Sequence, residues 1–123
     1  RYDILVNSKN KKTQIMIQVK TTSQNKSSWQ MKPDDAESPD KNFYYCFVDL
    51  SSKPEKVYII PSKKVSTVLI EADKEWMSKP RKDGSPKGEH KMRMLKNNFL
   101  LNVKSAPDGW MNKYLEKWEV FTK

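Results

Sequence analysis

Several short stretches of the chain are rich in apolar, β-branched and aromatic residues and are bounded by polar runs, which is typical of β-strands. Residues 2–6 and 14–21 form two such stretches, with the polar run 7–12 between them. Two strands with a short polar connection predict an antiparallel hairpin. Residues 42–50 form the most apolar and aromatic run, and residues 57–60 follow it after a short polar turn. These two runs predict a second strand pair.

After Pro61 the continuous apolar runs give way to apolar residues at every third and fourth position. This spacing predicts a helix over residues 62–78, capped by Ser62 and ended before Pro80. The apolar residues lie on one helical face: Val65, Val68, Leu69, Ala72 and Trp76. Such a stripe predicts packing against a core.

The remaining segments carry weaker patterns. Residues 22–41 are polar and predict a long loop, with a strand fragment around 29–31 as an alternative. The short apolar run 99–103 fits either a strand or a helix. Three aromatic residues that fall four apart predict a short helix over 110–121 and close the core: Trp110, Tyr114 and Trp118.

Length and cysteine content narrow the class of protein. A chain of 123 residues has room for one compact domain, so we expect residues 1–123 to form a single unit. No apolar run approaches the ~20 residues that cross a bilayer, and residues 1–4 lack the layout of a signal peptide. The single cysteine, Cys46, excludes an internal disulfide framework and a multi-cysteine zinc site. These features predict a cytoplasmic protein without a membrane span.

The charge balance suggests a class of partner. The chain has 24 Lys or Arg and 15 Asp or Glu, a net charge of +9. A positive surplus attracts polyanions, and nucleic acid is the commonest polyanion that such a protein meets. Residues 79–93 are basic and rich in Pro and Gly, which predicts a loop that binds phosphates, with solubility alone as the competing interpretation. The candidate contacts are Arg81, Lys82, Lys87, His90, Lys91 and Arg93.

The first predicted hairpin brings together residues with catalytic chemistry. Side chains two apart share a strand face, so Gln18 and Lys20 point the same way. If the turn is centred between residues 10 and 11, Asp3 lies opposite Gln18. A carboxylate and a carbonyl oxygen suit Mg²⁺, and a nearby ammonium can neutralise charge that develops on a phosphate. The cluster predicts metal-assisted phosphodiester hydrolysis, with an ordinary ion pair between Asp3 and Lys20 as the alternative.

The residues around this cluster resemble a known family. Residues 2–6, the polar insert, residues 17–22 and Trp29 resemble the core of the PD-(D/E)XK nuclease-like superfamily, in the variant with Gln at the acidic position. The pattern is an Asp, a gap, and then Gln two positions before Lys. Similarity to a group of uncharacterised prokaryotic members continues through residues 43–50, residues 58–65, Trp76, residues 90–93 and Trp118.

The resemblance implies an α/β fold with a mixed central β-sheet flanked by helices. This restriction-endonuclease-like core usually begins with a helix that the present chain starts too late to contain. Asp3 and Gln18 would be metal ligands, Val19 a ligand through its backbone carbonyl, and Lys20 the catalytic lysine. The implied cofactor is Mg²⁺ or Mn²⁺ and the implied partner is DNA, while a dimer stays open. Because Gln18 is uncharged, the site should bind metal more weakly than in relatives with Glu.

Two other functions stay open. One is a catalytically inactive nuclease-like module that binds nucleic acid through the basic loop. The other is a protein-interaction domain of the same fold, with exposed aromatic contacts such as Tyr44 or Trp110. Asp49, which ends the aromatic strand, is an additional metal-ligand candidate. The other acidic residues before this strand are expected to be solvated turn residues: Asp34, Asp35, Glu37 and Asp40.

Overall fold

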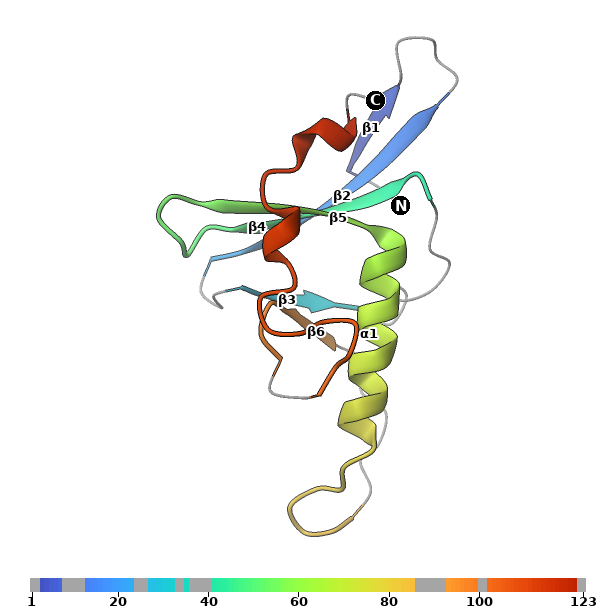
Figure 1. Cartoon of the computed structure of the whole chain (residues 1–123), viewed down its shortest axis with the longest axis vertical. Helices are drawn as coiled ribbons and strands as arrows, with labels where there is room; N and C mark the ends of the chain where they lie inside the picture. Colours follow the sequence, from blue (N-terminus) through green and yellow to red (C-terminus); the bar gives the residue numbers. More distant parts are fainter. Residues whose placement is uncertain are drawn as a thin grey trace.

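The structure, a computed structural model, describes residues 3–7, 13–23, 27–32, 35, 41–85, 93–99 and 102–121 (Figure 1). Its strands are β1 (Ile4–Asn7), β2 (Gln14–Thr22), β3 (Ser28–Met31), β4 (Phe43–Asp49), β5 (Lys56–Pro61) and β6 (Arg93–Lys96). The helices that lie within these ranges are α1 (Ser62–Met77) and the 3₁₀ helices η2 (Asn112–Tyr114) and η3 (Trp118–Phe121). The architecture is therefore mixed α/β.

Four strands form one mixed sheet in the order β1-β2-β4-β5. β1 is antiparallel to β2, and β4 is antiparallel to β5, so both predicted strand pairs are confirmed. The parallel pairing of β2 with β4 joins the two hairpins. A parallel pair needs a long crossover connection, and here that crossover contains β3.

β3 and β6 pair antiparallel as a separate two-stranded sheet. The strand fragment considered around residues 29–31 is thus confirmed. The sequence predicts no strand here and wrongly places Arg93, the first residue of β6, in the basic loop, because β6 has only Met94 and Leu95 as apolar residues. Leu95 is fully buried, so this strand supplies core contact despite its polar neighbours.

Aromatic packing fixes β3 on the main sheet. The ring of Trp29 lies 5.3 Å from that of Phe47 and 5.9 Å from that of Tyr58. The indole N–H of Trp29 donates a 3.1 Å hydrogen bond to the carbonyl of Val48. A buried tryptophan stabilises packing through its large apolar surface, and its N–H needs a hydrogen-bond partner, which Val48 supplies here. β3 is therefore held against β4 and β5.

The main core lies between the four-stranded sheet, α1 and the β3–β6 pair, as Figure 1 shows. α1 has the bounds that its apolar spacing predicts to within one residue. The proposed cap is wrong, because the N-cap position is Pro61 and Ser62 is already the first residue of the helix. Four of the five residues of the apolar stripe are buried, and Trp76 is partly exposed.

The opposite face of the sheet has a smaller cluster, formed by Ile17, Cys46 and Ile59. Val120 and Phe121 of η3 pack against it. The thiol of Cys46 is free and buried there, and burial raises its pKa to about 11. Both faces of the sheet are therefore covered.

The predicted helix over residues 110–121 is wrong, because the segment forms two 3₁₀ helices with a break between them. Leu115 pairs with Tyr58 in an isolated β-bridge, and Glu116 has a φ of 55°, outside the helical region. Trp110 is buried and its indole donates a 2.7 Å bond to Lys96, whereas Trp118 is 48% exposed. Trp110 therefore closes the core as expected, and it is not an exposed contact.

The ambiguous run 99–103 lies partly outside the described residues, and Phe99, Asn102 and Val103 belong to neither a helix nor a strand.

Within the described part of the chain, no helix has the length and apolarity that crossing a bilayer requires.

Candidate functional site

The β1–β2 hairpin has the register that the sequence predicts. Ile4 faces Ile17 and Asn7 faces Gln14. One step beyond the Ile4–Ile17 pair, the same register sets Asp3 against Gln18. The backbone N–H of Asp3 donates a 2.8 Å bond to the carbonyl of Ile17, which extends the ladder past the first residue of β1.

The carboxylate of Asp3 contacts the main chain of β2. Its Oδ2 atom accepts a 2.7 Å hydrogen bond from the backbone N–H of Val19. The N–H and C=O of one strand residue point to the same neighbouring strand, so the carbonyl of Val19 also faces the side of Asp3. Asp3 itself is exposed. The structure therefore brings together a solvent-accessible carboxylate and a main-chain carbonyl.

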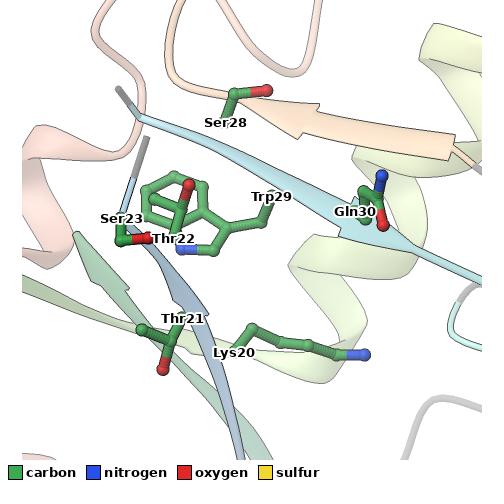
Figure 2. A pocket seen from close by; sticks show the side chains of 7 residues that line it. All are labelled: Lys20, Thr21, Thr22, Ser23, Ser28, Trp29 and Gln30. Carbon is green, nitrogen blue, oxygen red and sulfur yellow. The ribbon is translucent and has the colours of Figure 1, made fainter. Parts of the chain in front are cut away.

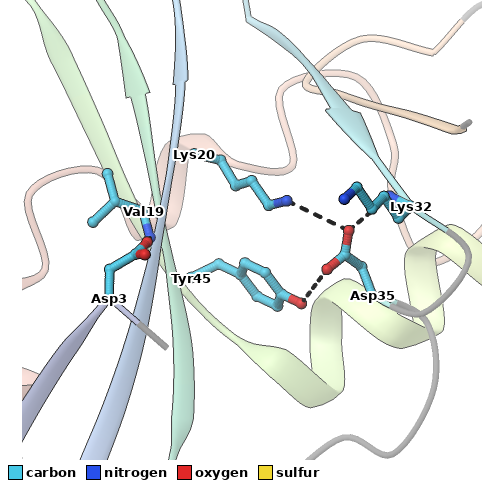
Figure 3. A network of polar contacts seen from close by, with 6 residues as sticks. All are labelled: Asp3, Val19, Lys20, Lys32, Asp35 and Tyr45. Atoms are coloured by element: carbon cyan, nitrogen blue, oxygen red, sulfur yellow. Dashed lines mark hydrogen bonds and ion pairs between the residues drawn. The ribbon is translucent and has the colours of Figure 1, made fainter. Parts of the chain in front are cut away.

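Gln18 and Lys20 belong to the face of β2 that the main core covers. The parallel register sets Gln18 beside Tyr45 and Lys20 beside Phe47, and both aromatic residues are buried. Figure 3 shows the carboxylate of Asp3 on one side of β2 and the ammonium of Lys20 on the other. The predicted register is confirmed, but Asp3 and Lys20 do not come together in this structure.

The acidic partner of Lys20 is Asp35. The Nζ of Lys20 lies 3.5 Å from Oδ2 of Asp35, and their side chains are 19% and 2% exposed. Asp35 also accepts a 3.1 Å bond from the hydroxyl of Tyr45 and a 2.7 Å bond from the backbone N–H of Lys32 (Figure 3). An ion pair between Asp3 and Lys20, the alternative drawn from the sequence, is therefore wrong.

The expectation that Asp35 is a solvated turn residue is also wrong. The backbone N–H of Asp35 donates a 2.9 Å bond to the carbonyl of Lys32, and the side chain is only 2% exposed. Its carboxylate then meets a cation, a hydroxyl and a backbone N–H, which together compensate for the loss of water. The other acidic residues of this segment lie outside the described residues: Asp34, Glu37 and Asp40.

A cavity of about 320 Å³ lies between the end of β2 and β3. Figure 2 shows the side chains of both strands around it. β2 and the residue after it contribute Lys20, Thr21, Thr22 and Ser23, and β3 contributes Ser28, Trp29 and Gln30. Lys20 thus connects the cavity with the ion pair to Asp35.

Asp49 anchors the loops next to this cavity. It is 2% exposed, and it accepts hydrogen bonds of 3.1 Å from the backbone N–H of Ser27 and of 2.9 Å from that of Ser51. Burial acts to raise the pKa of Asp49, but the bonds from Ser51 and Ser27 outweigh it and leave the pKa below its ordinary value. Its oxygens are thus engaged in holding the start of β3, and the structure gives Asp49 a structural role instead of that of a metal ligand.

The described part of the basic segment lies beyond the end of α1, away from the four-stranded sheet (Figure 1). Arg81 and Lys82 are exposed there, in a turn closed by a bond from the N–H of Arg81 to the carbonyl of Ser85. The remaining candidate contacts to nucleic acid lie outside the described residues or, for Arg93, have an undescribed side chain: Lys87, His90, Lys91 and Arg93.

The available metal donors are few but suit a hard cation. The described residues contain no group of three or more His, Cys, Asp or Glu side chains that would hold a metal. The carboxylate of Asp3, the carbonyl of Val19 and the amide oxygen of Gln18 are oxygen donors, and Mg²⁺ commonly uses one or two carboxylates and keeps several waters. This donor set therefore fits Mg²⁺ or Mn²⁺ better than a softer metal such as zinc.

Comparisons of the chain with protein-family models, with curated proteins and with solved structures found no match. Function is therefore inferred from the residues and their geometry.

Proposed function

We propose that the protein is a metal-dependent nuclease that hydrolyses phosphodiester bonds of DNA on a restriction-endonuclease-like core. The observation that carries the proposal is the contact between the carboxylate of Asp3 and the main chain of Val19. It joins the Asp of the D…QxK pattern to the strand that bears Gln18 and Lys20, in the register that the pattern requires.

Each residue of the pattern has a role in this proposal. Asp3 and the carbonyl of Val19 would hold the cation beside β2, and Gln18, whose side chain belongs to the core-covered face, would have to turn its amide oxygen toward them. When bound, Mg²⁺ supplies the positive charge that polarises a phosphate and acidifies a water molecule. Lys20 is the catalytic lysine, which orients the attacking water or neutralises charge on the phosphate. In this structure the ammonium lies with Asp35 on the other side of β2 from Asp3, so this role requires the four-carbon stem of Lys20 to leave Asp35 and turn toward the substrate.

The net charge of +9 supports DNA as the substrate. In the proposal, the basic segment holds the phosphate backbone beyond the site: Arg81, Lys82, Lys87, His90, Lys91 and Arg93. Such contacts position the protein without reading the base sequence.

Asp3→Asn tests the proposal. Asn keeps an oxygen that can accept the bond from Val19 but lacks the negative charge, so the fold should persist while the metal is lost. We expect calorimetry to show Mn²⁺ binding to the wild type and not to Asp3→Asn, and cleavage of a panel of DNA structures to fall at least about 100-fold. Asp108→Asn, at an exposed aspartate, is the matched control. Equal Mn²⁺ binding or equal cleavage by the wild type and Asp3→Asn would refute the proposal.

A catalytically inactive module that binds nucleic acid is the second candidate. The contact of Lys20 with buried Asp35, on the other side of β2 from Asp3, favours it. Its signature is metal-independent DNA binding without cleavage. Arg81→Ala and Lys82→Ala should each lower the slope of log affinity against log salt by about 1, whereas Lys53→Ala, at another exposed lysine, should not. No DNA binding at low salt would point instead to a protein partner.

A further inference from the structure

Most of the residues that line the cavity between β2 and β3 are polar. Six of its seven lining residues carry a hydroxyl, amide or ammonium group. The seventh, Trp29, is a rigid wall, because its ring packs on Phe47 and Tyr58 and its N–H is bonded to Val48. Apolar ligands bind in pockets lined mainly by apolar side chains, so this cavity suits a polar ligand.

Several of these polar groups have unused hydrogen-bonding capacity. Across the described residues, the side chains of Thr21, Ser23, Ser28 and Gln30 have no hydrogen-bond partner. Hydroxyl and amide groups both donate and accept hydrogen bonds, which matches the hydroxyl, ether and carbonyl oxygens of a sugar or a base. The lining therefore offers complementary contacts to an oxygen-rich molecule.

Lys20 supplies the charge of the cavity. Its ammonium has three N–H donors, and Asp35 lies on one side of it at 3.5 Å. The remaining donors are available to an anion in the cavity, and no Asp or Glu is among the lining residues. A cavity with one cation and no carboxylate favours an anionic ligand over a metal ion.

We propose that this cavity binds one sugar–phosphate unit of a nucleic acid strand, with the phosphate on Lys20 and the sugar or base against Ser28 and Gln30. A volume of about 320 Å³ is at the small end of ligand pockets, which fits a single nucleotide and excludes a base pair. The inference rests on the proposed function and deepens it, because it adds a nucleotide-binding cavity at Lys20, the residue that the proposal assigns to the substrate phosphate.

The test is a titration of ¹⁵N-labelled protein, followed by NMR, in buffer with EDTA. The probes are thymidine 5′-monophosphate, deoxyribose 5-phosphate and inorganic phosphate. We expect saturable shifts of the backbone amides in residues 20–23 and 28–30, with the nucleotide binding more tightly than inorganic phosphate. Ser28→Ala and Gln30→Ala should each weaken nucleotide binding about threefold to tenfold and leave phosphate binding unchanged.

Two further variants complete the design. Gln14→Ala removes an exposed glutamine at the opposite end of β2 and should leave every affinity unchanged. Lys20→Gln combined with Asp35→Asn removes both charges together, so that no buried charge is left alone, and should weaken all three probes at least about tenfold. If this double variant fails to fold, Gln30→Ala against Gln14→Ala still decides the question.

Three results would overturn the inference. They are the absence of saturable shifts up to about 10 mM probe, inorganic phosphate binding as tightly as the nucleotide, and equal affinities of Gln30→Ala and Gln14→Ala. Because EDTA removes the metal, these results do not depend on cleavage. If the cavity binds the nucleotide but Asp3→Asn keeps wild-type metal affinity, the cavity assignment stands and the nuclease proposal is refuted. If the cavity does not bind the nucleotide but Asp3→Asn loses the metal, the cavity assignment is refuted and the nuclease proposal stands.

Discussion

Lys20 and Asp35 form an ion pair across the main core, with 3.5 Å between the ammonium nitrogen and the carboxylate. Asp35 comes from the polar crossover between β2 and β4, yet its side chain is only 2% exposed. A buried carboxylate is costly without a cation or hydrogen bonds. The side chain proposed for catalysis therefore also stabilises the fold.

Lys20→Ala should lower the free energy of unfolding by about 1–3 kcal/mol, because it leaves the carboxylate of Asp35 buried without its cation. Adding Asp35→Asn should restore part of this loss. Urea unfolding of the wild type, both single variants and the double variant measures the coupling. Lys32→Ala is the control, since only the backbone of Lys32 contacts Asp35. Strictly additive effects of the two substitutions would show that the pair does not interact.

The sequence predicts the position of Asp3 in the candidate site but not the partner of Lys20. The hairpin register follows from local counting, so the position of Asp3 against Gln18 is predictable. The partner of Lys20 depends on where the long polar crossover returns, and on Tyr45, which only the parallel β2–β4 register brings near. Neither of these contacts of Asp35, with Lys20 and with Tyr45, follows from spacing along the sequence. From the sequence alone, Asp35 is therefore predicted to be solvated.

The tail shows the same limit for secondary structure. The spacing of Trp110, Tyr114 and Trp118 matches a helix, and the spacing of the α1 stripe matches one equally well. In α1 the buried stripe and the helix agree. In the tail, the bridge between Leu115 and Tyr58 draws the chain back to β5 and breaks the helix. Tertiary contacts override local periodicity there.

Gln18→Glu should strengthen Mg²⁺ binding if the proposed metal site is correct. The substitution adds a carboxylate opposite Asp3 at the position where a hard cation is proposed to bind, and carboxylates are stronger ligands of Mg²⁺ than amides. We expect calorimetry to show about a tenfold gain in affinity, equivalent to about 1.4 kcal/mol. Gln14→Glu, at the other end of β2, is the control and should show no gain. An equal affinity of Gln18→Glu and wild type would argue against Gln18 as a ligand.

Cys46 should resist thiol reagents in the folded protein. Its pKa of about 11 leaves about one thiolate per thousand at pH 8, and the side chain is buried between Ile17 and Ile59. Labelling by an aromatic disulfide reagent should therefore be slow in buffer and should accelerate in urea in parallel with unfolding. The rate is followed by the absorbance of the released thiol. Rapid stoichiometric labelling in buffer would show that the sheet opens locally at β4.

Asp49 should make stability depend on pH in the acid range. Its pKa in the folded state is lowered, so its contribution is present above the ordinary value of 3.8 and is lost as the pH falls through the folded pKa. Asp49→Asn should cost about 1–3 kcal/mol at pH 7, since one amide group cannot accept both the Ser27 and Ser51 N–H bonds.

The difference in stability between the wild type and Asp49→Asn should therefore shrink as the pH falls below 3.8, as urea unfolding at successive pH values would show. Asp83→Asn is a closely matched control. Asp83 accepts bonds from the N–H and hydroxyl of Ser85, as Asp49 does from Ser51, but it is exposed at the turn beyond α1. The bonds from Ser85 also lower the pKa of Asp83, so the effect of Asp83→Asn should depend on pH with the same sign, but it should be much smaller because water can replace those bonds. A pH-independent cost of Asp49→Asn would mean that shape, and not charge, holds β3 in place.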